Sequence, residues 1–240
     1  MKTTICNTPF STERKTVVLV KPSEPTPSEV LSFSSIDHDP NMEDLCQSVY
    51  AYKAHDDQNF SVGNTGQVAD PACIIEEALS KVLVYYFSLA GKLRRGSDGR
   101  FQLKCTADGV PFVVATASCH LSSLNYLEGI DNETARQFVS DFQGESDFGY
   151  HPLIFQVTKL SCGGFAVGMT LSHSVCDGVG AAQFFRALTE LASGKSEPPI
   201  KPVWERERLV GIPTQEPFHF LVDKSFFRNF AILAYFRHRP

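Results

Sequence analysis

The sequence lacks the features that mark membrane-spanning, secreted and zinc-binding proteins. Its longest apolar runs cover only residues 82–87 and 230–236, far short of the roughly 20 residues that span a bilayer. Residues 1–6 carry no apolar core of a secretory signal. The seven cysteines are an odd number without a C-x-x-C pair, which favours reduced thiols over a disulfide framework or a zinc site. We therefore expect a cytoplasmic protein that binds no metal and no membrane.

Basic residues are in the minority. The chain has 22 Lys and Arg residues against 27 Asp and Glu residues, which gives a net charge of -5. Because nucleic-acid affinity depends on clustered Lys and Arg, we expect no nucleic-acid partner. A hydrophobic content of 42% and a length of 240 residues are sufficient for one large domain, or two small ones, with a sizeable core.

Apolar periodicity predicts a mixture of strands and helices, and hence an α/β layered fold. A helix is expected after Asp70 and Pro71, because Asp accepts hydrogen bonds at an N-cap and Pro fits the first turn. Its buried face would consist of Ile75, Leu79, Val82, Leu83 and Tyr86. Strands are expected at residues 16–20, 31–35, 48–52, 101–104, 112–116, 155–160 and 165–171, and a loop at residues 55–66.

The most informative motif is H-x-x-x-D-G, formed by His173, Asp177 and Gly178. It follows the predicted strand at residues 165–171 and precedes a predicted helix at residues 180–193. The apolar stripe of this helix should pack on the same sheet, and it consists of Ala181, Phe184, Phe185, Leu188 and Ala192. A histidine at the end of a strand is well placed to deprotonate an alcohol or amine that attacks an activated carbonyl.

Several alternatives are open for the motif. Asp177 could orient the imidazole as in a catalytic triad, or it could brace the turn through an arginine or backbone partner, and we favour the bracing role. Cys176 could be a nucleophile, although cysteine in an apolar turn is more often inert packing. A metal site at His173 and Asp177 would need a third ligand, and none stands nearby at a diagnostic spacing. His173 could also be an ordinary core histidine.

Further motifs occur in a fixed order between residues 15 and 224. They are LSFSSID at residues 31–37, LAGKL at 89–93, DGVPF at 108–112, PLIFQVT at 152–158, CGGF at 162–165, HSVCDG at 173–178 and VWERERL at 203–209. Together they resemble the plant BAHD acyl-CoA-dependent acyltransferases. Within that family, LSSLNY at residues 121–126, TELASGK at 189–195 and the W-x-R-E-R-L segment resemble the spermidine hydroxycinnamoyl and sinapoyl transferases.

The resemblance implies a fold, a reaction and a role for each motif residue. The implied fold is that of the CoA-dependent acyltransferases, similar to chloramphenicol acetyltransferase, with a mixed sheet and flanking helices. His173 would be the general base, Asp177 mainly structural, and Gly178 would allow a tight turn. The implied substrates are an acyl-CoA donor, with no bound cofactor, and a small amine or alcohol acceptor such as spermidine. Family members are mostly monomeric.

The match to the family is incomplete. Members are about twice as long as this chain, and their second domain carries a D-F-G-W-G segment that is absent here. We therefore interpret residues 1–224 as the N-terminal acyltransferase domain. The Phe- and Arg-rich residues 225–240 would be either an amphipathic terminal helix or a tail foreign to the family. The 240-residue chain is expected to be inactive alone, and the alternative is a non-catalytic product that binds a partner or is degraded.

Overall fold

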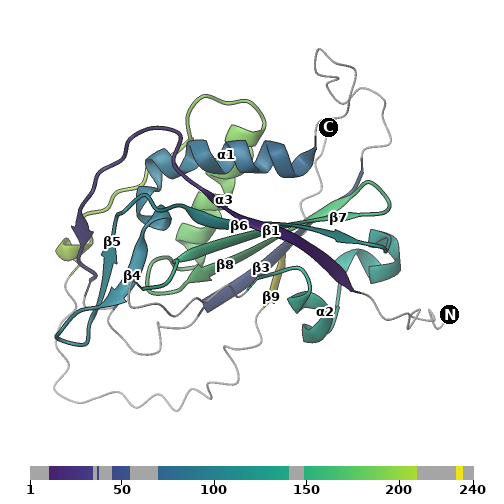
Figure 1. Ribbon diagram of the computed structural model, residues 1–240, viewed down its shortest axis with the longest axis horizontal. Helices are drawn as coiled ribbons and strands as arrows, with labels where there is room; N and C mark the ends of the chain where they lie inside the picture. The colour runs from purple at the N-terminus through teal and green to yellow at the C-terminus, as the bar shows by residue number, and fades with distance from the viewer. Residues whose placement is uncertain are drawn as a thin grey trace.

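A six-stranded sheet is the centre of the molecule (Figure 1). The computed structural model describes residues 11–34, 37, 45–54, 70–140, 149–209 and 231–234, so the loop expected at residues 55–66 lies outside the described residues. The strand order is β1-β6-β7-β8-β3-β9. The bounds are β1 (Thr12–Val20), β6 (Val110–Ala117), β7 (Leu153–Leu160), β8 (Phe165–Ser172), β3 (Leu45–Tyr52) and β9 (Ala231–Ala234).

The sheet is mixed, as expected for the predicted α/β fold. β6 runs parallel to β7 and β3 runs parallel to β9, whereas the other neighbours are antiparallel. Five of the predicted strands, those beginning at residues 16, 48, 112, 155 and 165, fall within observed strands. The prediction is confirmed here because these segments are rich in β-branched and aromatic residues that suit a buried sheet.

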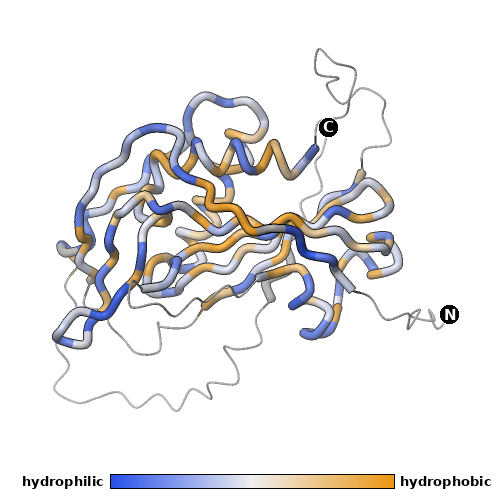
Figure 2. Tube along the Cα trace, viewed as in Figure 1, coloured by the Kyte–Doolittle hydropathy of each residue, from blue (hydrophilic) through white to orange (hydrophobic). Residues whose placement is uncertain are grey.

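Two helices, α1 (Pro71–Tyr85) and α3 (Gly178–Ala192), pack on one face of the sheet (Figure 1). α1 begins as predicted, because the Asp70 carboxylate accepts a hydrogen bond from the Ala72 amide at 3.0 Å and Pro71 occupies the first turn. The alternating colours along α1 in Figure 2 show its amphipathic character. None of the helices described here combines the length and the apolar content that crossing a bilayer demands.

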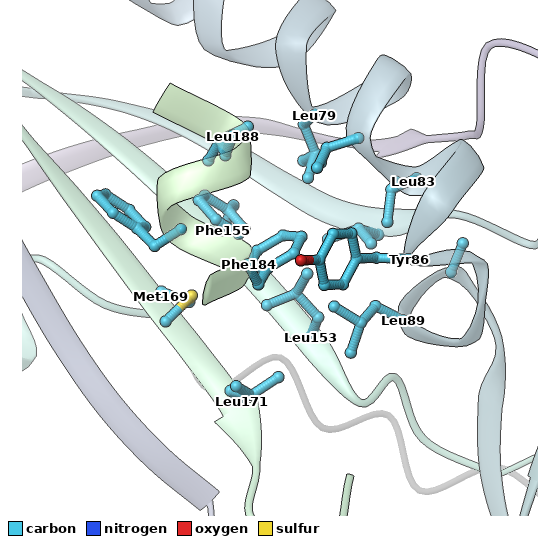
Figure 3. Close-up of a cluster of buried hydrophobic side chains, with 14 of the residues drawn as sticks. Leu79, Leu83, Tyr86, Leu89, Leu153, Phe155, Met169, Leu171, Phe184 and Leu188 are labelled. Atoms are coloured by element: carbon cyan, nitrogen blue, oxygen red, sulfur yellow. The ribbon is translucent and has the colours of Figure 1, made fainter. Parts of the chain in front are cut away.

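The predicted apolar faces of both helices enter one core with the sheet (Figure 3). Phe184 of α3 is 0% exposed, and its ring makes edge contacts with Tyr86 and Phe155 at centroid distances of 5.2 and 6.2 Å. Around these rings lie Leu79, Leu83, Leu153, Met169, Leu171 and Leu188. This packing fixes α3 against β7 and β8, and so holds the start of α3 beside the end of β8.

The opposite face is covered by two elements that the sequence did not indicate. They are the 3-10 helix η3 (Leu121–Leu127) and the short helix α2 (Asn132–Arg136). Phe138, which follows α2, is 0% exposed in the core on this side. Its carbonyl oxygen lies so close to Gly168 of β8 that a Cβ atom there would clash with it.

A second, antiparallel sheet has the order β2-β5-β4. Its strands are β2 (Val30–Leu31), β5 (Phe101–Lys104) and β4 (Lys92–Arg95). The prediction is confirmed for β5, and β4 was not foreseen. The strand expected at residues 31–35 is wrong at residues 32–34, and residue 35 lies outside the described residues. Ser34 and Asp37 exchange hydrogen bonds instead, from the Ser34 amide to Asp37 Oδ2 at 3.0 Å and from the Asp37 amide to Ser34 Oγ at 3.2 Å, and such local bonds compete with strand pairing.

The segment at residues 225–240 is described only at β9. Its four residues pair in parallel with residues 47–50 of β3. The alternative of a terminal helix is therefore wrong for Ala231–Ala234, where the backbone is a strand.

Candidate functional site

His173 is the first residue after β8, a strand in the interior of the sheet. The strand is fixed up to its last residue, because the Ser172 amide donates a hydrogen bond to the Pro152 carbonyl at 2.8 Å. His173 is half-buried. Its Nδ1 atom is buried, and within the described part of the chain it has no hydrogen-bond partner. The imidazole is thus presented at the end of a rigid strand, with one ring nitrogen away from solvent.

The turn after His173 closes on the carbonyl of Ser172. The amides of Val175 and Cys176 both donate to this oxygen, at 3.1 and 3.2 Å. α3 begins two residues earlier than predicted, at Gly178, with Asp177 as its N-cap. His173 therefore lies between a strand and a helix that are separated by only five residues.

Asp177 uses its carboxylate to cap α3. Its Oδ1 atom accepts the Gly180 amide at 2.8 Å, and its backbone carbonyl accepts the Ala181 amide at 2.8 Å. The side chain is exposed. Since the buried Nδ1 of His173 has no partner among the described residues, the imidazole–carboxylate bond of a triad is not formed in this arrangement. The partner of Asp177 is backbone, which was one of the two partners considered for a bracing role.

The turn does not require glycine at position 178, contrary to what the family resemblance implied. Gly178 does not adopt a positive φ angle, and a Cβ atom built there would meet nothing within 4 Å. It is the first residue of α3, where an ordinary residue also fits. The close approach lies at Gly180 instead, where a Cβ atom would stand 2.7 Å from Cys176 Sγ.

Cys176 does not have the properties of a nucleophile. Burial, together with the nearby Asp177 carboxylate, raises the pKa of its thiol to about 12. A nucleophilic cysteine needs a lowered pKa, because the thiolate is the reactive form. The thiol stays protonated near neutral pH, which leaves Cys176 as a packing residue beside the turn.

Arg206 is the residue at this site that sequence reasoning missed. It lies in the 3-10 helix η4 (Arg206–Arg208) and donates to the carbonyls of Ser174, at 3.0 Å, and Val175. It also pairs with Asp37 Oδ2 at 3.3 Å. The LSFSSID and VWERERL motifs that contain Asp37 and Arg206 therefore meet at the H-x-x-x-D-G turn. Their place among the family motifs was the only signal for them.

A second polar pair lies at the same end of the sheet. Lys92 Nζ is 2.6 Å from His151 Nε2. Because the Pro152 carbonyl accepts the Ser172 amide, His151, which precedes β7, and His173, which follows β8, flank the same end of this strand pair. Burial and the Lys92 ammonium lower the pKa of His151 to about 4, and burial lowers the pKa of Lys92. The His151 ring is neutral near pH 7, and its Nε2 atom accepts a hydrogen bond from the Lys92 ammonium.

Metal coordination finds no support in the described ranges of the chain. They contain no group of three or more His, Cys, Asp or Glu side chains that could hold a metal ion. At this site the described residues present the His173 imidazole, the start of α3 capped by Asp177, and the Arg206 guanidinium, which binds the turn between them.

Comparison with known proteins assigns this arrangement to a family. Residues 10–234 match the Transferase family. The Arabidopsis thaliana spermidine coumaroyl-CoA acyltransferase is 47% identical over 212 residues, which are 87% of this chain and 44% of the relative. The spermidine sinapoyl-CoA acyltransferase of the same plant is 44% identical over 218 residues, covering 88% of this chain and 46% of the relative. The chain thus spans less than half the length of these curated relatives.

The fold agrees with the sequence comparison. The crystal structure of vinorine synthase superposes on 81% of this chain with a TM-score of 0.64 and 25% sequence identity, and the match covers 46% of that chain. Both comparisons confirm the family resemblance found from the motifs, and the sequence relatives confirm the likeness to spermidine acyltransferases. The chain belongs to the transferase family of the BAHD acyl-CoA-dependent acyltransferases.

Proposed function

We propose that this chain supplies the general base of an acyltransferase that moves a hydroxycinnamoyl group from CoA to an amine such as spermidine. The observation that carries the proposal is the placement of His173, a half-buried histidine at the end of an interior strand with a buried Nδ1. The relatives named for spermidine and coumaroyl-CoA or sinapoyl-CoA support the substrate class.

The proposed reaction needs one base and no covalent enzyme intermediate. As the amine nitrogen attacks the thioester carbonyl, His173 accepts a proton from that nitrogen. The new C–N bond forms, the C–S bond breaks, and the proton passes to the CoA thiolate that leaves. A thioester already carries a good leaving group, so the enzyme need not provide a nucleophile of its own. The raised pKa of Cys176 agrees with this mechanism.

Asp177 has a structural role in this proposal. Its carboxylate accepts the Gly180 amide and its side chain is exposed, which supports a role in starting α3 rather than in orienting the imidazole. The start of α3 in turn limits where the backbone of residues 173–176 can lie.

The test is an acyl-transfer assay with coumaroyl-CoA and spermidine. It uses the 240-residue chain and, in parallel, a chimera in which residues 10–209 replace the matching region of the Arabidopsis spermidine coumaroyl-CoA acyltransferase. His173→Ala should lower kcat/KM by about a hundred- to ten-thousandfold, the usual contribution of a general base. His120→Ala is the matched control, because His120 is exposed and precedes η3. This substitution should leave kcat/KM unchanged.

Two results would contradict the proposal. One is a His173→Ala variant that is as fast as the parent protein. The other is a chimera that folds and binds coumaroyl-CoA but transfers no acyl group to any amine or alcohol acceptor, which would favour a non-catalytic role.

We also propose a cytoplasmic location. The six cysteines in the described part of the chain are free, which fits a reducing compartment. Fractionation of cells that express a tagged chain tests this placement, and recovery in the secreted fraction would contradict it.

A further inference from the structure

One guanidinium group connects the turn after His173 to two distant parts of the chain. Arg206 donates to the carbonyls of Ser174, at 3.0 Å, and Val175, and it pairs with the Asp37 carboxylate at 3.3 Å. These two carbonyls belong to the second and third peptides after His173, which join residues 174–175 and 175–176. We propose that Arg206, held by Asp37, is a positioning residue that fixes the backbone carrying the His173 imidazole. The inference rests on the proposed function, since it assumes that His173 is the base.

The turn needs such a partner because it is buried. Ser174 is 0% exposed and Val175 is 2% exposed. The amides of Val175 and Cys176 donate to the Ser172 carbonyl, but the carbonyl groups of a buried turn also need donors. Arg206 provides both donors from one rigid, planar group. Arginine suits this task because its fork presents several N–H groups in a fixed geometry, whereas lysine has a single ammonium.

Arg206 is itself held from two sides. On one side Asp37 is fixed by its reciprocal bonds with Ser34, and the side chains of Arg206 and Asp37 are only 19% and 22% exposed. On the other side Trp204 donates from Nε1 to the Tyr85 carbonyl at 3.3 Å. The indole ring also makes edge contacts with Phe87 at a centroid distance of 5.6 Å. The guanidinium is therefore held by Asp37, and the segment that carries it is anchored through Trp204 to the end of α1.

These contacts indicate an effect on catalysis that passes through the backbone. Proton transfer requires the base within hydrogen-bond reach of the reacting nitrogen, and misplacement by about 1 Å can cost a hundredfold in rate. Arg206 binds the peptides at residues 174–175 and 175–176, so a shift of these peptides reaches the imidazole through the backbone of Ser174. Its role is distinct from that of Asp177, which caps α3 at the other end of the turn.

Amide hydrogen exchange on the 240-residue chain tests the positioning directly. In Arg206→Ala, exchange at the Val175 and Cys176 amides should rise about ten- to a hundredfold, as expected when bonds to a charged donor are lost. Exchange at Met169 in the middle of β8 should stay unchanged. Arg208→Ala is the matched control, because Arg208 lies in the same 3-10 helix, its side chain is 73% exposed, and its ion pair is with Glu205 of its own segment at 2.7 Å.

Arg206→Lys gives the same test with the charge retained beside Asp37. It should show the same local rise in exchange, because a compact ammonium lacks the planar fork of donors with which Arg206 reaches two carbonyls and a carboxylate. Unchanged exchange at Val175 and Cys176 in both variants would overturn the proposal. So would an equal rise at Met169, because that pattern shows general destabilisation.

The effect of Arg206 on catalysis is tested in the 240-residue chain or in the chimera, according to which of them shows turnover that depends on His173. Arg206→Lys should lower kcat about ten- to a hundredfold with KM little changed, and in a His173→Ala background it should have no further effect. An equal loss in both backgrounds would overturn the positioning role. If no preparation transfers acyl groups, the proposed function fails, while the exchange experiment still decides whether Arg206 holds the turn.

Discussion

At the residue scale, the N-cap geometry of Asp177 determines what its substitution should do. Asp177→Ala removes the acceptor for the Gly180 amide and should lower the free energy of unfolding by about 1 kcal/mol, the typical value for an N-cap. Asp177→Asn keeps a capping oxygen and should cost less. Urea denaturation measures both. An Asn variant that is destabilised as much as the Ala variant would show that α3 requires the charge of the carboxylate, and not only a capping oxygen.

His151 should make the stability of the protein depend on pH. Burial and the Lys92 ammonium lower its pKa from 6.5 to about 4. Between these values the unfolded chain binds more protons than the folded chain, so stability is full above pH 6.5 and is lost as the pH falls towards 4. The loss should reach at most about 3 kcal/mol, and less where solvent screens the ring.

The measurement is urea denaturation at pH 7 and pH 4.5, with His151→Gln as the control. Glutamine cannot take up the proton, so the variant should lose less stability than the parent over this interval. Carboxylates that titrate at low pH contribute equally to both proteins, and the difference between them isolates His151. Equal losses in the two proteins would contradict the prediction.

At the scale of elements, two glycines near the site should respond in opposite ways. Gly168→Ala places a methyl group against the Phe138 carbonyl and should cost about 1–3 kcal/mol through displacement of the segment after α2. Gly178→Ala adds a methyl group in open space at the start of α3 and should be neutral or stabilising by up to about 1 kcal/mol. Thermal denaturation distinguishes them. A large loss for Gly178→Ala would restore the requirement for glycine in the turn.

The elements that sequence patterns predicted are those with long apolar periods. α1 and α3 bury one face at a helical period, and the central strands β7 and β8 are nearly continuous buried runs. β4 was missed since it has one buried residue, Leu93, among exposed or half-buried basic residues. α2 has only five residues, too few for a helical period. The strand predicted after Leu31 failed because Ser34 and Asp37 bond to each other locally.

At the scale of the whole molecule, the candidate site is a meeting of distant segments. The position of His173 after a strand and before a helix could be predicted because strand, turn and helix follow one another in the sequence, whereas the N-cap role of Asp177 was not predicted. The contact between Arg206 and Asp37 could not be predicted, since the two residues are separated by 169 positions. Only the tertiary fold brings them together, through the packing of Trp204 on Tyr86 and Phe87. No local spacing carries this information, and the family motifs indicated only that both segments matter.

The core between the helices and the sheet supports this arrangement, and its loss should destabilise the whole molecule. Phe184 is 0% exposed and its ring contacts Tyr86 and Phe155, so Phe184→Ala should cost about 3–5 kcal/mol. Domains are commonly stable by only about 5–15 kcal/mol, so the urea midpoint should fall steeply. Val179→Ala, at a 75% exposed position of the same helix, should stay within about 0.5 kcal/mol of the parent. Similar midpoints for the two variants would contradict the assignment of Phe184 to the core that holds α3 beside His173.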